Sequence, residues 1–166
     1  MKFSVAAINV SLLVLLAGTS PLSRAEVAPE MDAYRGKTGR FECSAQETGS
    51  GKTFKAYVEN EVAYDGHTFV ERYYEVPSAE RPQAWKAIFL MSYDEKARRW
   101  VRNGVDNAGQ RNAASSSGWK GDTWAWEMDG ANIPVTKKGP DAFTFAVDVK
   151  DQGKLKRVVE ALCKRM

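Results

Sequence analysis

The sequence has 166 residues, 43% of them hydrophobic and 27% charged, with a formal net charge of +3. This length supports a single domain with a core of its own. The small positive excess argues against a nucleic-acid partner, because nucleic-acid-binding domains usually carry a large basic excess on one face.

Residues 1–25 have the features of a cleavable signal peptide. Lys2 gives the segment a positive start, and residues 5–17 are largely apolar. Ser23 and Ala25 are the small residues that a signal peptidase reads before it cuts. The apolar stretch is shorter than the roughly 20 residues that a membrane-spanning helix needs. We therefore expect export with cleavage.

Export implies a periplasmic or secreted protein without a membrane anchor. Residues 26–38 would form a short lead-in, and residues 39–166 would form one β-barrel domain. A lipid anchor is not expected, because Thr19 stands where lipidation would need a cysteine. Removing Lys2 and Arg24 with the leader lowers the formal charge from +3 to +1.

The chain has two cysteines, Cys43 and Cys163, which lie near the two ends of the expected domain. In an oxidising compartment such a pair favours a disulfide over free thiols. Two sulfurs and the single histidine, His67, offer too few ligands for a zinc site. We expect a disulfide, no metal and no cofactor.

Turn-forming residues recur along the chain and leave little room for long helices. They cluster at residues 49–51, 65–66, 77–78, 94–95, 103–104, 121–122, 129–130, 139–141 and 151–153. Between them, Phe143, Phe145 and Val147 alternate with other residues, and Trp124 and Trp126 share one face, as in half-buried strands. We predict strands at residues 40–46, 53–59, 68–75, 85–93, 99–102, 123–127, 132–137 and 143–150.

Residues 154–166 fit two patterns. A helix would carry a stripe made by Leu155, Val158, Val159 and Leu162. A strand would carry on one face Leu155, Arg157, Val159, Ala161 and Cys163. We favour the strand, because pairing the last strand with the first closes a barrel and hides both sheet edges. The predicted fold is all-β, an antiparallel up-and-down meander that closes into a barrel of about 8–10 strands.

Short motifs along the chain are similar to those of one protein family. They lie at residues 39–43 (GRFEC), 92–94 (SYD), 99–101 (RWV), 105–109 (VDNAG), 117–124 (SGWKGDTW) and 163–165 (CKR). Together they resemble a family of exported bacterial proteins with a lipocalin-like (calycin-type) β-barrel. The resemblance implies a barrel and a periplasmic or secreted location, and it assigns no activity to named residues.

Several patterns could suggest catalysis or nucleotide binding, and each is incomplete. Residues 49–53 (GSGKT) match only the tail of a phosphate-binding loop and precede a strand where that loop needs a helix. His67 shows no nucleophile or orienting partner in sequence, and serines 115–117 lack the turn of a hydrolase nucleophile. Glu71 and Glu75 would lie roughly 13 Å apart, too far for a retaining carboxylate pair. We expect no enzymatic activity, with a site around His67 as the less favoured alternative.

Aromatic residues on the faces of predicted strands are the main functional signal. Because side chains alternate between lumen and exterior, five of them could line a lumen that binds a small apolar or amphiphilic molecule. They are Tyr74, Phe89, Trp100, Trp124 and Trp126. The simpler interpretation is that these rings fill the barrel, since small barrels are often packed solid. A second functional class is a cell-envelope interaction module that works through its outer surface.

Overall fold

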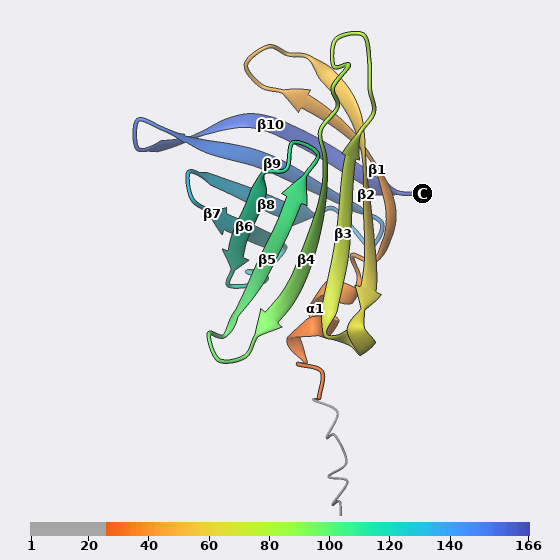
Figure 1. Ribbon diagram of the computed structural model, residues 1–166, viewed down its shortest axis with the longest axis vertical. Coiled ribbons are helices and arrows are strands. Elements are labelled where there is room, and N and C mark those ends of the chain that lie inside the picture. Colours follow the sequence, from red (N-terminus) through yellow and green to blue (C-terminus); the bar gives the residue numbers. More distant parts are fainter. Residues whose placement is uncertain (1–25) are drawn as a thin grey trace, which may run out of the picture.

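The computed structural model describes residues 26–166, and the expected signal peptide lies outside them. Within the described residues, ten antiparallel strands form one closed barrel (Figure 1). In chain order they are β1 (Gly39–Glu47), β2 (Thr53–Ala63), β3 (Thr68–Glu75), β4 (Lys86–Asp94), β5 (Arg99–Asp106), β6 (Arg111–Ser116), β7 (Thr123–Met128), β8 (Ala131–Lys137), β9 (Ala142–Asp151) and β10 (Lys154–Arg165).

Each strand pairs with the next one in the chain, and β1 pairs with β10. The all-β class, the up-and-down meander and the closure of the first strand on the last are therefore confirmed. The strand predicted for the carboxyl-terminal segment is confirmed as β10. The thinnest seam lies between β6 and β7, which share only the Ser115–Glu127 pair.

The predicted disulfide between Cys43 and Cys163 is present and joins β1 to β10. The two residues are directly opposite in the strand register, and their Cα atoms are 4.0 Å apart. Both are fully buried and belong to the core inside the barrel, together with Phe41 and Ala45. The bond therefore fastens the seam where the two ends of the meander meet.

The turn predicted at Asn103 and Gly104 is wrong, because β5 continues through both residues. Phe89 on β4 lies directly opposite Gly104, and a Cβ at position 104 would come within 2.2 Å of the Phe89 ring. The glycine thus leaves room for a ring that crosses the neighbouring backbone, a use of glycine that is common inside strands. Strand β6 was not predicted, because its small polar residues carry little alternation.

A bulge interrupts β10 between Arg157 and Val159. The extra residue of a bulge shifts the alternation, so that side chains on its two sides exchange faces. Val159, Ala161 and Cys163 pack in the core inside the barrel. Leu155 and Arg157 are instead exposed on the outer surface. The single strand face predicted from Leu155 to Cys163 is therefore wrong, and the bulge is the reason.

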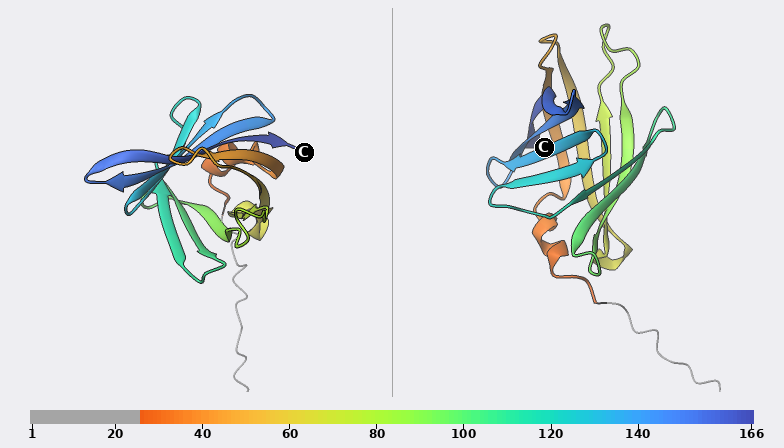
Figure 2. Two further views of the ribbon diagram at one scale, coloured as in Figure 1. Left: turned by 90° about the horizontal axis from the view of Figure 1, so that it is seen from above. Right: turned by 90° about the vertical axis from the view of Figure 1, so that its left-hand side faces the viewer.

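The lead-in contains a short helix, α1 (Glu30–Arg35), that was not predicted from the sequence. Figures 1 and 2 show it at one end of the barrel, opposite the β1–β2 and β3–β4 loops. Met31 and Tyr34 are buried. The Tyr34 ring packs against Phe69 and Trp124, with centroids 4.9 and 5.4 Å apart. Helix α1 therefore closes this end of the barrel.

A single turn of 3-10 helix, η1 (Tyr64–Gly66), connects β2 to β3 near the same end. No helix among the described residues has the length and apolar character needed to span a membrane.

Candidate functional site

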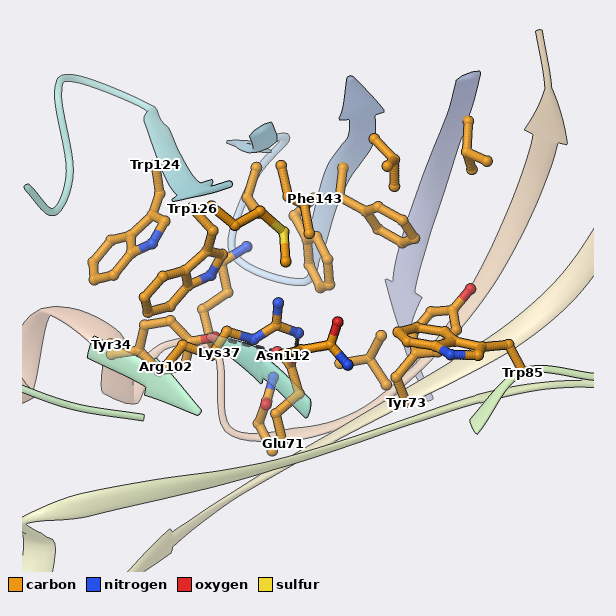
Figure 3. Close-up of a pocket in the computed structure, with 18 of the residues that line it drawn as sticks. Tyr34, Lys37, Glu71, Tyr73, Trp85, Arg102, Asn112, Trp124, Trp126 and Phe143 are labelled. Carbon is orange, nitrogen blue, oxygen red and sulfur yellow. Dashed lines mark hydrogen bonds and ion pairs between the residues drawn. The ribbon is translucent and has the colours of Figure 1, made fainter. Parts of the chain in front are cut away.

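A cavity of about 330 Å³ lies inside the barrel (Figure 3). Its wall comes mainly from alternate residues of β2, β3, β7, β8, β9 and β10, with α1 at one end. Apolar and aromatic side chains make up most of it: Phe54, Val58, Tyr73, Trp85, Trp124, Trp126, Met128, Ile133, Val135, Phe143, Phe145, Val147 and Val159. Such a wall suits a ligand with an apolar body.

A buried ion pair lies in the lumen. Arg102 Nη2 on β5 donates to Glu71 Oε1 on β3 at 2.6 Å, and the side chains are 9% and 14% exposed. The Tyr34 hydroxyl donates to Glu71 Oε2 at 3.4 Å. Burial, together with the negative charge of Glu71, raises the pKa of Tyr34 well above its ordinary value. The centre of the Arg102 guanidinium is 3.4 Å from the centre of the Phe89 ring. The two buried charges thus compensate each other.

Lys37 lies at the α1 end of the cavity and is 8% exposed. Its ammonium is 3.7 Å from the centre of the Phe143 ring and 5.5 Å from that of Trp119. Within residues 26–166 the Lys37 ammonium makes no hydrogen bond and no ion pair. Burial, and next the nearby charge of Lys137, lower the pKa of Lys37 to about 7.

Arg165 of β10 fixes the backbone on both sides of Lys37. Its Nη2 donates to the Gly36 carbonyl at 3.1 Å, and its Nη1 donates to the Thr38 carbonyl at 2.6 Å. Its Nε donates to Asp141 Oδ1 at 2.8 Å, which orients the guanidinium. The segment that carries Lys37 is therefore tied to the last strand of the barrel.

Trp85 marks the place where the cavity meets solvent, since it lines the lumen and is 36% exposed. It ends the β3–β4 loop, at the end of the barrel away from α1 (Figure 1). Its indole N–H donates to Asp106 Oδ2 at 3.1 Å, and its ring packs against Tyr73 with centroids 5.1 Å apart. Glu75 Oε2 accepts from Arg81 Nη2 at 2.9 Å and from the Trp85 backbone N–H at 3.2 Å. These bonds hold the loop over the mouth.

Three polar atoms of cavity-lining residues are buried without a partner among the described residues. They are Asn60 Oδ1, Arg102 Nε and Trp124 Nε1. Buried polar groups are nearly always hydrogen-bonded, so unpaired ones often mark a place for water or a ligand. These three atoms lie within the wall and have almost no accessible surface, so they are gaps in the hydrogen bonding of the wall rather than contacts open to the cavity.

The five aromatic residues predicted to line a lumen fall into three groups. Trp124 and Trp126 border the cavity (Figure 3). Phe89 and Trp100 point into the barrel but are buried in its packed core and lie outside the cavity wall. Tyr74 lies on the outer face, where its hydroxyl donates to Glu59 Oε1 at 2.6 Å, and this placement differs from the expected one. Its neighbour Tyr73 points inward instead, because adjacent strand residues face opposite sides.

The charged residues of the lumen were missed as a site. A signal for two of them was present, since Glu71 is two residues from Phe69 and Arg102 is two residues from Trp100. Residues two apart on a strand share a face, so a charge between inward-facing aromatics indicates a buried polar group. Lys37 carried no such signal, because its neighbours Gly36 and Thr38 are typical of an exposed turn.

The features weighed for catalysis lie in different parts of the molecule. His67 follows η1 and is not part of the cavity wall. Residues 49–53 connect β1 to β2 and lead into a strand. Glu71 and Glu75 both face the lumen, but each is paired with an arginine. Within the described chain, no three His, Cys, Asp or Glu side chains are grouped as a metal site would need.

A scan against protein-family models finds no match, and neither does a search of curated proteins. Among solved structures, a de novo designed fluorescence-activating β-barrel is similar, with a TM-score of 0.48 and 12% sequence identity. The match covers 81% of this chain and 98% of the designed one. A likeness of this size indicates nothing about function, and membership of the exported family stays a prediction.

Proposed function

We propose that the barrel binds one small molecule with an apolar body in its lumen, without converting it chemically. The observation that carries the proposal is the cavity of about 330 Å³ with aromatic walls. Sites for small molecules usually measure roughly 300–1,000 Å³ and combine apolar walls with a few polar groups. The lumen is at the small end of that range, so a compact ligand is expected.

The ligand is amphiphilic rather than purely apolar. The cavity wall includes polar side chains, among them Lys37, Asn60 and Asn112, which can pair with a polar group of a ligand. A purely apolar ligand would leave the Lys37 ammonium unpaired and would add nothing to offset the cost of its burial. An apolar body with one polar end satisfies both kinds of surface.

The outer surface offers less support for an interaction module. Ile88, Leu90 and Val105 are exposed on the outer faces of β4 and β5. Ile88 lies directly opposite Val105, so these residues form one small apolar patch. A patch of three such side chains is ordinary on globular proteins and does not by itself indicate a partner. The lumen therefore carries the proposal.

We also propose that the domain works outside the cytoplasm. The Cys43–Cys163 bond supports this, because disulfides persist mainly in oxidising compartments. The signal-peptide pattern of residues 1–25 supports it independently. Protein recovered from the periplasm or medium is expected to begin at or near Glu26 when its mass is measured. An intact Met1 terminus in that fraction would contradict the proposal.

Binding is expected to change tryptophan emission, because Trp85, Trp124 and Trp126 border the cavity. The experiment is a fluorescence titration with fatty acids, isoprenoids and aromatic compounds. Trp126→Ala is expected to weaken binding about tenfold or more, since one buried ring contributes roughly 1.5–3 kcal/mol from its area. The variant should stay folded, because the disulfide and the remaining strands keep the barrel closed.

A second variant fills the cavity instead of enlarging it. Val147→Phe on β9 places a larger side chain in the lumen, and it is expected to abolish binding at concentrations that saturate the parent. Leu90→Phe is the matched control, since it makes a comparable change on the outer face of β4. Binding that survives Val147→Phe unchanged would place the ligand elsewhere.

A further inference from the structure

Lys37 brings into the lumen a positive charge that the protein does not neutralise. Arg102 also lines the cavity, and its charge is compensated because it pairs with Glu71. Among the described residues, the Lys37 ammonium contacts the aromatic faces of Phe143 and Trp119 and no carboxylate. An aromatic face attracts a cation, but it does not replace the hydration and counter-charge that burial removes.

The charged residues around Lys37 add to the uncompensated positive charge. Lys137 of β8 lies on the same Trp119 ring, with its ammonium 4.1 Å from the ring centre. Lys137 and Arg165 of β10 both oppose the charge of Lys37, whereas Glu71 of β3 favours it. Because Glu71 already pairs with Arg102, the α1 end of the lumen keeps a net positive charge.

The ammonium is also held where it is. Arg165 ties the carbonyls on both sides of Lys37, and the Lys37 backbone N–H donates to the Tyr34 carbonyl at 2.8 Å. A long lysine side chain normally reaches for water. Here the backbone is fixed at the closed end of the barrel, and the ammonium lies 3.7 Å from the centre of the Phe143 ring, which lines the cavity.

We infer that the ligand is a carboxylic acid whose carboxylate pairs with Lys37, while its apolar body lies along the aromatic wall toward Trp85. This inference rests on the proposed function and names its ligand class. A single ammonium suits a singly charged head; a phosphate ester carries nearly two charges and would need further cations. A charge-assisted bond is also stronger than a neutral one, which makes the acid better than its uncharged analogues.

The test compares three ligands with the same tail: decanoate, decan-1-ol and decylamine. Tryptophan emission is followed at pH 6.5, where Lys37 still carries most of its charge because its pKa is about 7. Decanoate is expected to bind about ten- to a hundredfold more tightly than the alcohol, as expected for one hydrogen bond between charged groups. The amine is expected to bind more weakly than either.

Lys37→Met removes the charge and keeps a similar length. It is expected to bring decanoate and decan-1-ol to equal affinity, while leaving the affinity for the alcohol within about threefold of the parent. Lys137→Met is the matched control, because it removes a neighbouring ammonium that lies outside the cavity wall. The preference for the acid should survive in that variant.

A pH series on the parent protein makes the test independent of how Lys37→Met folds. Decanoate stays ionised above pH 6, since carboxyl groups titrate near pH 4. Below pH 7 Lys37 is already protonated, so the affinity for decanoate should not change with pH. Above pH 7 Lys37 is mostly neutral in the free protein, so binding of decanoate requires the uptake of a proton. The affinity for decanoate should therefore fall by up to tenfold per pH unit above pH 7, while the affinity for the alcohol stays constant.

Equal binding of acid and alcohol by the parent, with no pH dependence, would overturn the assignment of the carboxylate and leave lumen binding intact. A preference for the acid that persists in Lys37→Met would move the head group to another residue. If none of the three ligands, and nothing in the wider panel, alters the emission, the proposed function itself fails.

Discussion

Breaking the Cys43–Cys163 bond is expected to lower the free energy of unfolding by about 2–5 kcal/mol, the usual loss for a small disulfide-bonded domain. The bond joins residues with a sequence separation of 120, so it removes much of the freedom of the unfolded chain. It also fastens the seam where β1 and β10, the first and last strands of the meander, pair with each other. Denaturant unfolding of Cys43→Ser against the parent measures the loss.

Ser44→Ala is the control for this prediction. Ser44 is the neighbour of Cys43 on β1 but is exposed, so its change should alter the free energy of unfolding by less than about 0.5 kcal/mol. The parent should show no titratable thiol in denaturant without reductant. Two titratable thiols, together with an unchanged unfolding curve for Cys43→Ser, would show that the bond does not hold the barrel.

Glu71→Gln is expected to destabilise the protein by about 3–5 kcal/mol, because it leaves the buried Arg102 charge without its partner. The positive charge of Lys37 faces the same lumen and adds to the cost. Urea unfolding at pH 7 measures the effect. Glu61→Gln is the matched control, since it breaks the exposed Glu61–Arg72 pair, which involves the same strand β3 and should matter by less than about 1 kcal/mol.

The double variant Glu71→Gln with Arg102→Met separates the ion pair from other effects of the substitution. Removing both charges leaves no uncompensated ion, so the double variant should be more stable than Glu71→Gln alone. The two changes should therefore be non-additive. A loss for Glu71→Gln as small as that for Glu61→Gln would mean that water reaches Arg102 freely and that the lumen is wetter than its burial indicates.

The alternation of side chains made much of the fold predictable. Trp124 and Trp126, and Phe143 with Phe145, show which face of β7 and β9 points into the barrel without any knowledge of their neighbours. The β10 strand could be chosen over a helix because only a strand closes the barrel. The prediction thus combined local alternation of side chains with one requirement on the whole sheet, that its edges be paired, and the structure shows both.

Features that depend on contacts between distant segments could not be predicted. Helix α1 is too short to show a helical period, and Tyr34 is placed by rings from β3, β5 and β7. The sequence around Gly104 indicates a turn, because nothing in it shows that the ring of Phe89 from the neighbouring strand packs over this glycine. The bulge before Val159 shifts the face of every earlier residue of β10.

In the candidate site, too, some features could be predicted from local patterns and others depend on contacts between distant segments. The tryptophans of β7 could be placed in the lumen because a strand face is readable from sequence. Whether that lumen is filled or hollow depends on the total volume of the inward-facing side chains compared with the volume that the barrel encloses. Strand tilt and register set the enclosed volume, and neither can be read from the sequence. Lys37 reaches the cavity only because α1 and Arg165 hold its segment against the barrel end.

The central claim is that the lumen of this barrel holds a ligand. A crystal structure of the protein with the tightest ligand of the titration panel tests it most directly. We expect the ligand between Trp126, Tyr73 and Phe143, with its carboxylate within about 3 Å of the Lys37 ammonium. Ligand bound on the outer surface, or a lumen filled by the protein's own side chains, would contradict the account.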